Sequence, residues 1–334
     1  MCHQLPKWLT VVTLLLIHTT SQAGLIRHDV PATEYERLAQ NPHFAAAGYV
    51  FHGSIGFWHS GVLVTPNTVL TSAHAFDPEF TGNITRLLTE IYFGTSPNPL
   101  DGPTYTVTDV LLNPIWPMRP AEHDLALLRL DRPVEGVTPA RVRAVHPVGS
   151  VAVSIGYGLQ SDGLGRELKD IAWRLAHEAT IDFVGSEDGK VIAAVGAPSE
   201  EAKNFGITIR SDFDHPDGSR NSYGSAWPRL LEGGTATGDS GGPLFVSSQT
   251  SDEWFVAGIL FGGFNPYHYP DDNGYGNISL WSPLSSAANQ EFLRDNGIAV
   301  VPEPSTIIMT FTILLYRLMI YVIRRLRLSA ATMS

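Results

Sequence analysis

Cysteine is almost missing from this sequence: among 334 residues the only thiol is that of Cys2. A disulfide framework is therefore excluded, and with it the small secreted scaffolds that depend on one. The chain is 43% hydrophobic and 16% charged, which is typical of a globular protein rather than a disordered one. Its stability must come from a hydrophobic core, and the chain is long enough to bury one.

Positive charge is also scarce, with 22 Lys+Arg against 33 Asp+Glu. An acidic protein repels a phosphate backbone, so we expect no nucleic-acid partner. Metal-binding motifs are missing too. His177 lacks the second histidine of a zinc-protease motif, and Asp212, Asp214 and Asp217 do not have the spacing of an EF-hand. We expect no metal or organic cofactor, and we interpret 212–217 as a solvated acidic loop.

Long apolar runs occur only at the two ends of the chain. Near the start, Lys7 is followed by an apolar run over 8–17 and by the small-residue exit Ser21-Gln22-Ala23. This layout predicts a signal peptide over 1–23 that signal peptidase cleaves after Ala23. A buried N-terminal helix is the alternative.

The second apolar run covers 307–323 and is interrupted by two threonines and Arg317. Its length is close to the short limit for a transmembrane helix, and the arginine cluster at 324–327 predicts that this end stays on the cytoplasmic side. The order VPEPST, apolar helix, arginine cluster resembles the PEP-CTERM sorting signal, which implies processing by an exosortase. A plain C-terminal membrane anchor is the alternative. We therefore expect a protein exported from a bacterial cytoplasm, held at least transiently in the membrane, and then at the cell surface or secreted.

Between the two ends the chain consists mostly of short apolar or alternating runs separated by turn residues. Such runs predict an all-β sandwich or barrel. The runs lie at 61–76 (two strands), 104–112, 124–130, 150–158, 252–263 and 277–284. Helical periodicity is confined to 34–41, 197–204 and 285–295, and 210–225 is predicted to be a long polar loop.

One glycine-rich segment, EGGTATGDSGGPLF at 232–245, places Ser240 where the backbone is costly to order. A serine hydroxyl becomes a nucleophile only with a base, a group that orients the base, and donors for the oxyanion. His74 lies where an apolar strand runs into a small-residue turn, and Asp124 lies at the start of another apolar strand. A buried carboxylate needs a hydrogen-bond donor, and a histidine would supply one.

The segments TSAHAF, HDLALLRL and GDSGGPLF resemble, in this order, the three signature segments of the trypsin/chymotrypsin-like serine proteases. Weaker similarities lie at 60–63 and 155–158, and the resemblance spans about 45–295. It implies an all-β fold of two packed antiparallel six-stranded β-barrels with a short C-terminal helix. The domains would be an N-terminal segment at 24–44, a first barrel at 45–145, a second barrel at 146–297 and a tail at 298–334.

The resemblance also implies roles for individual residues. His74 would be the general base, Asp124 its orienting partner and Ser240 the nucleophile. The backbone N–H groups of Gly238 and Ser240 would form the oxyanion hole. Asp239 would pair with a newly exposed N-terminal amine and so lock this loop. The implied function is that of an exported serine endopeptidase acting on a polypeptide substrate.

The chain departs from the family pattern at two points. Ala75 and Ala236 stand where the family commonly has cysteines, and no Ile-Val-Gly-Gly-like start follows an arginine near the N-terminus; the nearest basic residue is Arg27. The partner of Asp239 therefore stays open: signal cleavage could free a terminus at Gly24, or another group could bind the carboxylate.

The substrate pocket implied by the resemblance carries no charge. Its floor would be Gly234 and Thr235, and its wall Phe261, Gly262 and Gly263. We therefore predict a preference for an uncharged residue, apolar or aromatic, before the scissile bond.

Two other functions fit parts of the sequence. One is a catalytically silent peptide-binding module of the same fold. The other is an esterase, since G-x-S-x-G is present at 238–242, although the α/β-hydrolase order places the serine before the histidine.

Overall fold

The computed structural model describes residues 24–53, 56–77, 89–96, 98–116, 120–168, 174–186, 206–223, 227–248, 251–266, 274–302 and 319. The predicted signal peptide at 1–23, the expected helix at 197–204 and, apart from residue 319, the predicted membrane helix at 307–323 lie outside these ranges. Within the described ranges, every helix is too short or too polar to cross a membrane.

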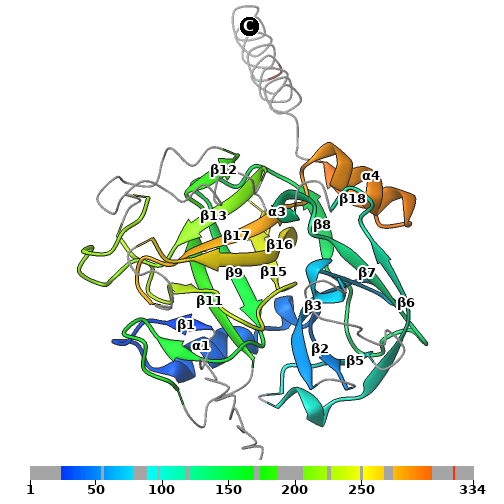
Figure 1. Ribbon diagram of the computed structural model, residues 1–334, viewed down its shortest axis with the longest axis horizontal. Coiled ribbons are helices and arrows are strands. Elements are labelled where there is room, and N and C mark those ends of the chain that lie inside the picture. The colour runs from blue at the N-terminus through cyan, green and yellow to red at the C-terminus, as the bar shows by residue number, and fades with distance from the viewer. Residues whose placement is uncertain are drawn as a thin grey trace, which may run out of the picture.

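Six antiparallel strands form a closed barrel, which lies on the right in Figure 1 and is called the first barrel below. Its order is β2-β3-β4-β7-β6-β5. Side chains that alternate along the strands fill its interior, among them Val50, Leu63, Ile91 and Leu128, all fully buried. The strands are β2 Ala47–His52, β3 Phe57–Thr65, β4 Thr68–Thr71, β5 Thr89–Phe93, β6 Thr104–Leu112 and β7 Ala126–Leu130.

The other half of the molecule is a larger sheet, called the second sheet, on the left in Figure 1. Its main path is β11-β9-β15-β16-β17-β13-β12, and β8 and β18 extend from β16. The core between its strands includes Ile209, Leu244, Phe255 and Trp281. The strands are β8 Arg141–Ala144, β9 Val151–Gly156, β11 Leu175–Thr180, β12 Phe183–Gly185, β13 Thr208–Asp212, β15 Pro243–Ser247, β16 Trp254–Phe264, β17 Ile278–Pro283 and β18 Val300–Pro302.

The prediction of a second closed six-stranded barrel was wrong, because no hydrogen-bonded ladder closes this sheet over the described residues. Its edge strands β11 and β12 are separated in sequence only by Ile181 and Asp182, so the two edges must come near each other. β12 has only three residues, which is too short to form a ladder along the whole of β11. The result is an open half-barrel beside a closed barrel.

The N-terminal segment packs on the second sheet rather than on the first barrel. Strand β1 Leu25–Ile26 lies between β10 Ser161–Asp162 and β14 Gly233–Gly234 in a three-stranded sheet. Helix α1 Ala32–Ala39 follows and packs beside β11, with Tyr35 fully buried. The first described residues therefore touch the segment that leads to Ser240.

Most predicted elements are present. The expected helices at 34–41 and 285–295 correspond to α1 and to α4 Ala287–Asp295, whose start is capped by the Ser286 side chain. The one mistaken loop is the start of 210–225, because β13 extends through Asp212. The remaining short helices are η1 Pro42–Phe44, η2 His74–Phe76, η4 Pro99–Asp101 and α3 Pro120–His123.

Candidate active site

The register of the first barrel brings His74 close to Asp124. Strands β4 and β7 are antiparallel, and the last residue of β4, Thr71, pairs with the first residue of β7, Ala126. The end of β4 and the start of β7 therefore lie at the same edge of the barrel. His74 begins η2 just after β4, and Asp124 lies just before β7.

Two hydrogen bonds fix this pair. The Nδ1 atom of His74 lies 2.6 Å from Oδ2 of Asp124, and the His74 backbone N–H donates to Oδ1 at 2.8 Å. Asp124 is completely buried. Burial alone would lower the pKa of His74, but the charge of Asp124 and its hydrogen bond outweigh burial and raise that pKa above its ordinary value of 6.5. The imidazole is therefore a stronger base than a free histidine.

Ser240 approaches the same imidazole from the second sheet. Its Oγ lies 3.0 Å from Nε2 of His74, on the opposite side of the ring from Asp124. The hydrogen-bonded chain Asp124–His74–Ser240 thus crosses from the first barrel to the second sheet. This arrangement lets a hydroxyl lose its proton to a ring that a carboxylate orients.

Backbone hydrogen bonds hold the turn around Ser240 from both halves. The Ser60 N–H of β3 donates to the Ser240 carbonyl at 2.8 Å, and the Ser60 hydroxyl donates to the Gly238 carbonyl at 3.2 Å. From β16, the Leu260 carbonyl accepts from the Gly241 N–H at 2.9 Å. Hydrogen bonds from both halves of the molecule therefore fix the backbone on either side of the Ser240 side chain.

Two of these glycines have conformations that other residues disfavour. Gly238 has φ +92°, and a Cβ there would lie 2.9 Å from the Gly158 Cα. Gly241 has φ +79°, and a Cβ there would lie 2.1 Å from Thr71 Oγ1. Side chains at either position would collide with neighbours in addition to straining the backbone. The glycines flank Ser240 because the turn leaves no room for anything larger.

A comparison with protein families matches residues 59–251 to the trypsin-like peptidase domain. The matched region covers more than half of the chain and contains His74, Asp124 and Ser240. The chain belongs to the trypsin-like peptidase family. This membership supports a hydrolase of the serine-protease type, whose substrate is a polypeptide.

Asp239 directly precedes Ser240 in this trypsin-like peptidase and accepts three backbone hydrogen bonds. The donors are Gly24 at 3.2 Å, Gly158 at 2.9 Å and Ala236 at 3.1 Å. Only 5% of Asp239 is exposed. Burial raises its pKa to about 6, although the three N–H donors act in the opposite direction. The carboxylate is thus costly to keep ionised unless a positive charge joins it.

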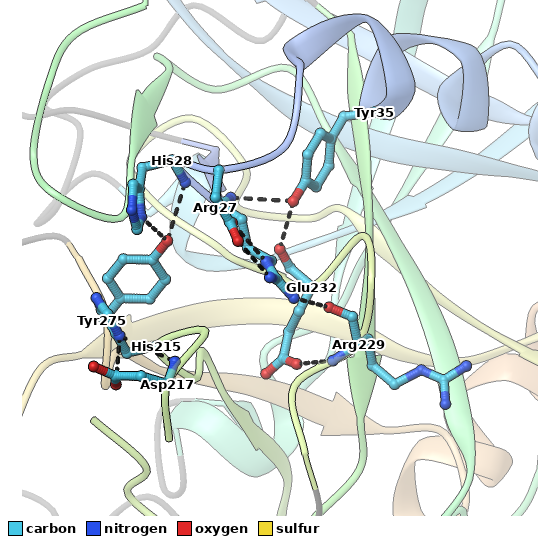
Figure 2. A network of polar contacts seen from close by, with 9 residues as sticks. Arg27, His28, Tyr35, His215, Asp217, Arg229, Glu232 and Tyr275 are labelled. Atoms are coloured by element: carbon cyan, nitrogen blue, oxygen red, sulfur yellow. Dashed lines mark hydrogen bonds and ion pairs between the residues drawn. The ribbon is translucent and has the colours of Figure 1, made fainter. Parts of the chain in front are cut away.

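The segment after Gly24 is tied to the second sheet by a polar network (Figure 2). The Tyr35 hydroxyl accepts from the Arg27 N–H at 3.1 Å and donates to the Glu232 carbonyl at 2.9 Å. The His28 ring contacts the Tyr275 hydroxyl at 2.7 Å. Together with the pairing of β1 and β14, these contacts hold Gly24 beside Asp239.

Of the residues predicted to form the pocket wall, Phe261 contacts His74. The Phe261 ring meets the His74 ring edge to face, with 5.8 Å between the ring centroids. A Cβ on the next residue, Gly262, would meet nothing within 4 Å, so the space beside it is open. The predicted wall therefore begins beside the imidazole.

The predicted floor consists of the last residue of β14, Gly234, and the residue that follows it, Thr235. Thr235 donates to Ser279 Oγ twice, from its backbone N–H at 3.2 Å and from its hydroxyl at 2.8 Å. Gly234 packs on Leu25, whose Cδ1 would be 2.9 Å from a Cβ at that position. The floor is thus in contact with the N-terminal strand, a relation that sequence motifs do not reveal.

The interpretation of 212–217 as a solvated loop was wrong for two of its three acids. Asp212 and Asp214 are 3% and 1% exposed, and only Asp217 lies on the surface. Asp212 ends β13 and accepts the backbone N–H groups of Ser222 and Tyr223. These two acids fold the loop back on itself.

A second consequence of this burial concerns charge. Burial, together with the charges of Asp212, Glu232 and Asp182, raises the pKa of Asp214 to about 9, so it carries a proton at neutral pH. Burial likewise raises the pKa of Glu232 to about 7.

Across the described ranges, no group of three or more His, Cys, Asp or Glu side chains is arranged to hold a metal ion.

Proposed function

We propose that the chain is an exported serine endopeptidase in which Asp124, His74 and Ser240 act as a catalytic triad. The observation that carries this proposal is the continuous hydrogen-bonded chain from Asp124 through His74 to Ser240 Oγ. Family membership gives the reaction class, and the raised pKa of His74 gives the base.

The mechanism is acyl transfer in two steps. Ser240 Oγ attacks the carbonyl carbon of the scissile bond while its proton passes to His74 Nε2. The backbone N–H groups of Gly238 and Ser240 stabilise the oxyanion, and the leaving amine takes the proton from His74 as the C–N bond breaks. A water molecule, deprotonated by His74, then attacks the ester. The acid product leaves, and Ser240 regains its proton.

Cleavage of the signal peptide during export would affect the active site through Gly24, which lies beside Asp239. Signal peptidase cleavage after Ala23 would convert the Gly24 amide into a free ammonium group beside the buried Asp239 carboxylate. The 3.2 Å separation of Gly24 N and Asp239 Oδ2 supports this pairing. The predicted membrane helix at 307–323 would hold the protein in the membrane until an exosortase cuts the chain ahead of it. Intact mass and N-terminal sequencing of the exported protein test both cuts, and a mature start other than Gly24 contradicts the first.

A fluorophosphonate probe, which reacts with activated serines, tests the triad. We expect it to label the wild-type protein and Ser247→Ala, whose serine is exposed on β15, but not Ser240→Ala. The labelled proteins should cleave an internal peptide bond of a denatured protein substrate. Absence of labelling in all three would indicate a silent peptide-binding module. Labelling with hydrolysis of esters alone would indicate an esterase.

A further inference from the structure

Asn277 lies between the predicted floor and the predicted wall of the pocket. It immediately precedes β17 and stands two positions before Ser279. Alternate residues of a strand share a face, so Asn277 is on the same side as the Ser279 hydroxyl that receives both hydrogen bonds from Thr235. The Asn277 side chain therefore faces the segment that leads to Ser240.

Distances from two glycines define its position. A Cβ placed on Gly234 would lie 3.4 Å from Asn277 Oδ1, and a Cβ placed on Gly263 would lie at the same distance from that atom. Gly234 belongs to the floor and Gly263 to the wall. The Asn277 carboxamide oxygen therefore lies between Gly234 and Gly263.

The carboxamide is also incompletely hydrogen-bonded. Asn277 is 3% exposed, and within the described part of the chain its Oδ1 has no hydrogen-bond partner. A buried acceptor without a donor is costly, and the molecule regains that free energy only when a donor arrives. The neighbouring Ser279 Oγ accepts two hydrogen bonds, which leaves its own proton to donate.

We propose that Asn277 determines specificity by selecting a carboxamide side chain, that of glutamine or asparagine, before the scissile bond. A substrate carboxamide has both a donor and an acceptor, so it pairs with Asn277 Oδ1 through its NH₂ group and accepts from Ser279. A phenylalanine ring satisfies neither group. This proposal rests on the proposed function. It predicts a neutral polar residue before the scissile bond, where the sequence alone predicts an apolar or aromatic one.

Peptides that differ only in the residue before the scissile bond test this proposal. With glutamine, asparagine, leucine, phenylalanine and arginine at that position, we expect kcat/KM for glutamine or asparagine to exceed that for phenylalanine by about tenfold. Asn277→Asp keeps the shape and adds a negative charge, so it should reverse the order and favour arginine over glutamine by about tenfold or more. Asn277→Gly should remove the amide preference and admit phenylalanine.

Asn67→Asp is the matched control, because it introduces the same charge at an exposed turn of the first barrel and should leave the order unchanged. The specificity proposal is overturned if the wild-type protein prefers phenylalanine to both amides, or if Asn277→Asp keeps the wild-type order. Fluorophosphonate labelling separates the two levels. If the wild-type protein is not labelled, the triad is refuted. If labelling is normal but Asn277→Asp keeps the wild-type order of substrates, only the role of Asn277 is refuted.

Discussion

The backbone nitrogen of Gly24 lies 3.2 Å from Oδ2 of Asp239, although 215 positions separate them in sequence. Because Asp239 directly precedes Ser240, the position of Gly24 and the backbone conformation around Ser240 depend on each other. The same contact connects the first described residue with the proposed oxyanion hole.

Blocking the Gly24 amine should therefore lower activity. We expect protein that begins at Gly24 to have a kcat/KM about 10- to 100-fold higher than the same protein with an acetylated N-terminus, since one charge-assisted hydrogen bond in a buried site is lost. In Asp239→Asn the difference between the two termini should disappear, which a double-mutant cycle would measure. Equal rates in the wild-type background would show that Asp239 is satisfied by backbone amides alone.

Asp124→Asn should reduce kcat/KM by about 10⁴-fold, because an amide at this position favours the wrong tautomer of His74. Steady-state kinetics on a peptide substrate give the loss. Asp252→Asn, an exposed acid on the loop before β16, is the control and should retain wild-type activity. A loss smaller than tenfold in Asp124→Asn would mean that the carboxylate does not orient the base.

The pH profile of the wild-type enzyme should reflect the raised pKa of His74. Only the neutral imidazole can accept the Ser240 proton, so activity is lost as pH falls through that pKa. Because Asp124 raises the pKa, half of the activity should be lost at a pH above 6.5. The measurement is kcat/KM between about pH 5 and 9; an acidic midpoint clearly below 6.5 is incompatible with the proposed base.

Gly241→Ala should inactivate and destabilise the protein. The new Cβ would lie 2.1 Å from Thr71 Oγ1 and 2.2 Å from the Ser60 carbonyl, so the cost exceeds the roughly 1 kcal/mol of a positive-φ alanine alone. Gly165→Ala separates the two effects, since Gly165 has φ +76° but no neighbour within 4 Å of its Cβ. Thermal unfolding should show a clearly larger loss for Gly241→Ala, and similar losses would argue against the tight turn.

Asp214 should make the folded state less stable as pH rises. Its pKa is about 9 when folded, against 3.8 for an ordinary aspartate. The folded protein therefore retains a proton that the unfolded chain releases, and stability falls between about pH 4 and 9. Asp214→Asn should stabilise the protein by about 1 kcal/mol or more at pH 8 and flatten this slope. Asp217→Asn, at an exposed position of the same loop, should do neither. Equal slopes in both variants would contradict the raised pKa of the buried Asp214.

The sequence predicts the features that depend on neighbouring residues better than those that depend on contacts between distant segments. The strands around His74 and Asp124 follow from alternating runs bounded by turn residues, and the helical periodicity at 285–295 predicts α4. The openness of the second sheet could not be predicted, because it depends on β12 being three residues long.

The burial of Asp212 and Asp214 was equally hidden, since an acid-rich segment normally lies in solvent. The donors that accompany this burial are Ser222 and Tyr223 for Asp212 and Asn221 for Asp214. The contacts of Gly24 and Asn277 join distant segments, and no periodicity or local motif encodes them. In each case the missing information was which backbone groups meet across the fold.

The division of the hydrogen-bonded chain between the two halves has a practical consequence. His74 and Asp124 lie in the first barrel, Ser240 lies in the second sheet, and the connection at 131–140 joins them. If this connection were cut, one polypeptide would lack Ser240 and the other would lack His74 and Asp124. Activity would return only on reassociation, at a rate set by the product of the two fragment concentrations, so a split version of this protein would report the proximity of any two molecules fused to its pieces.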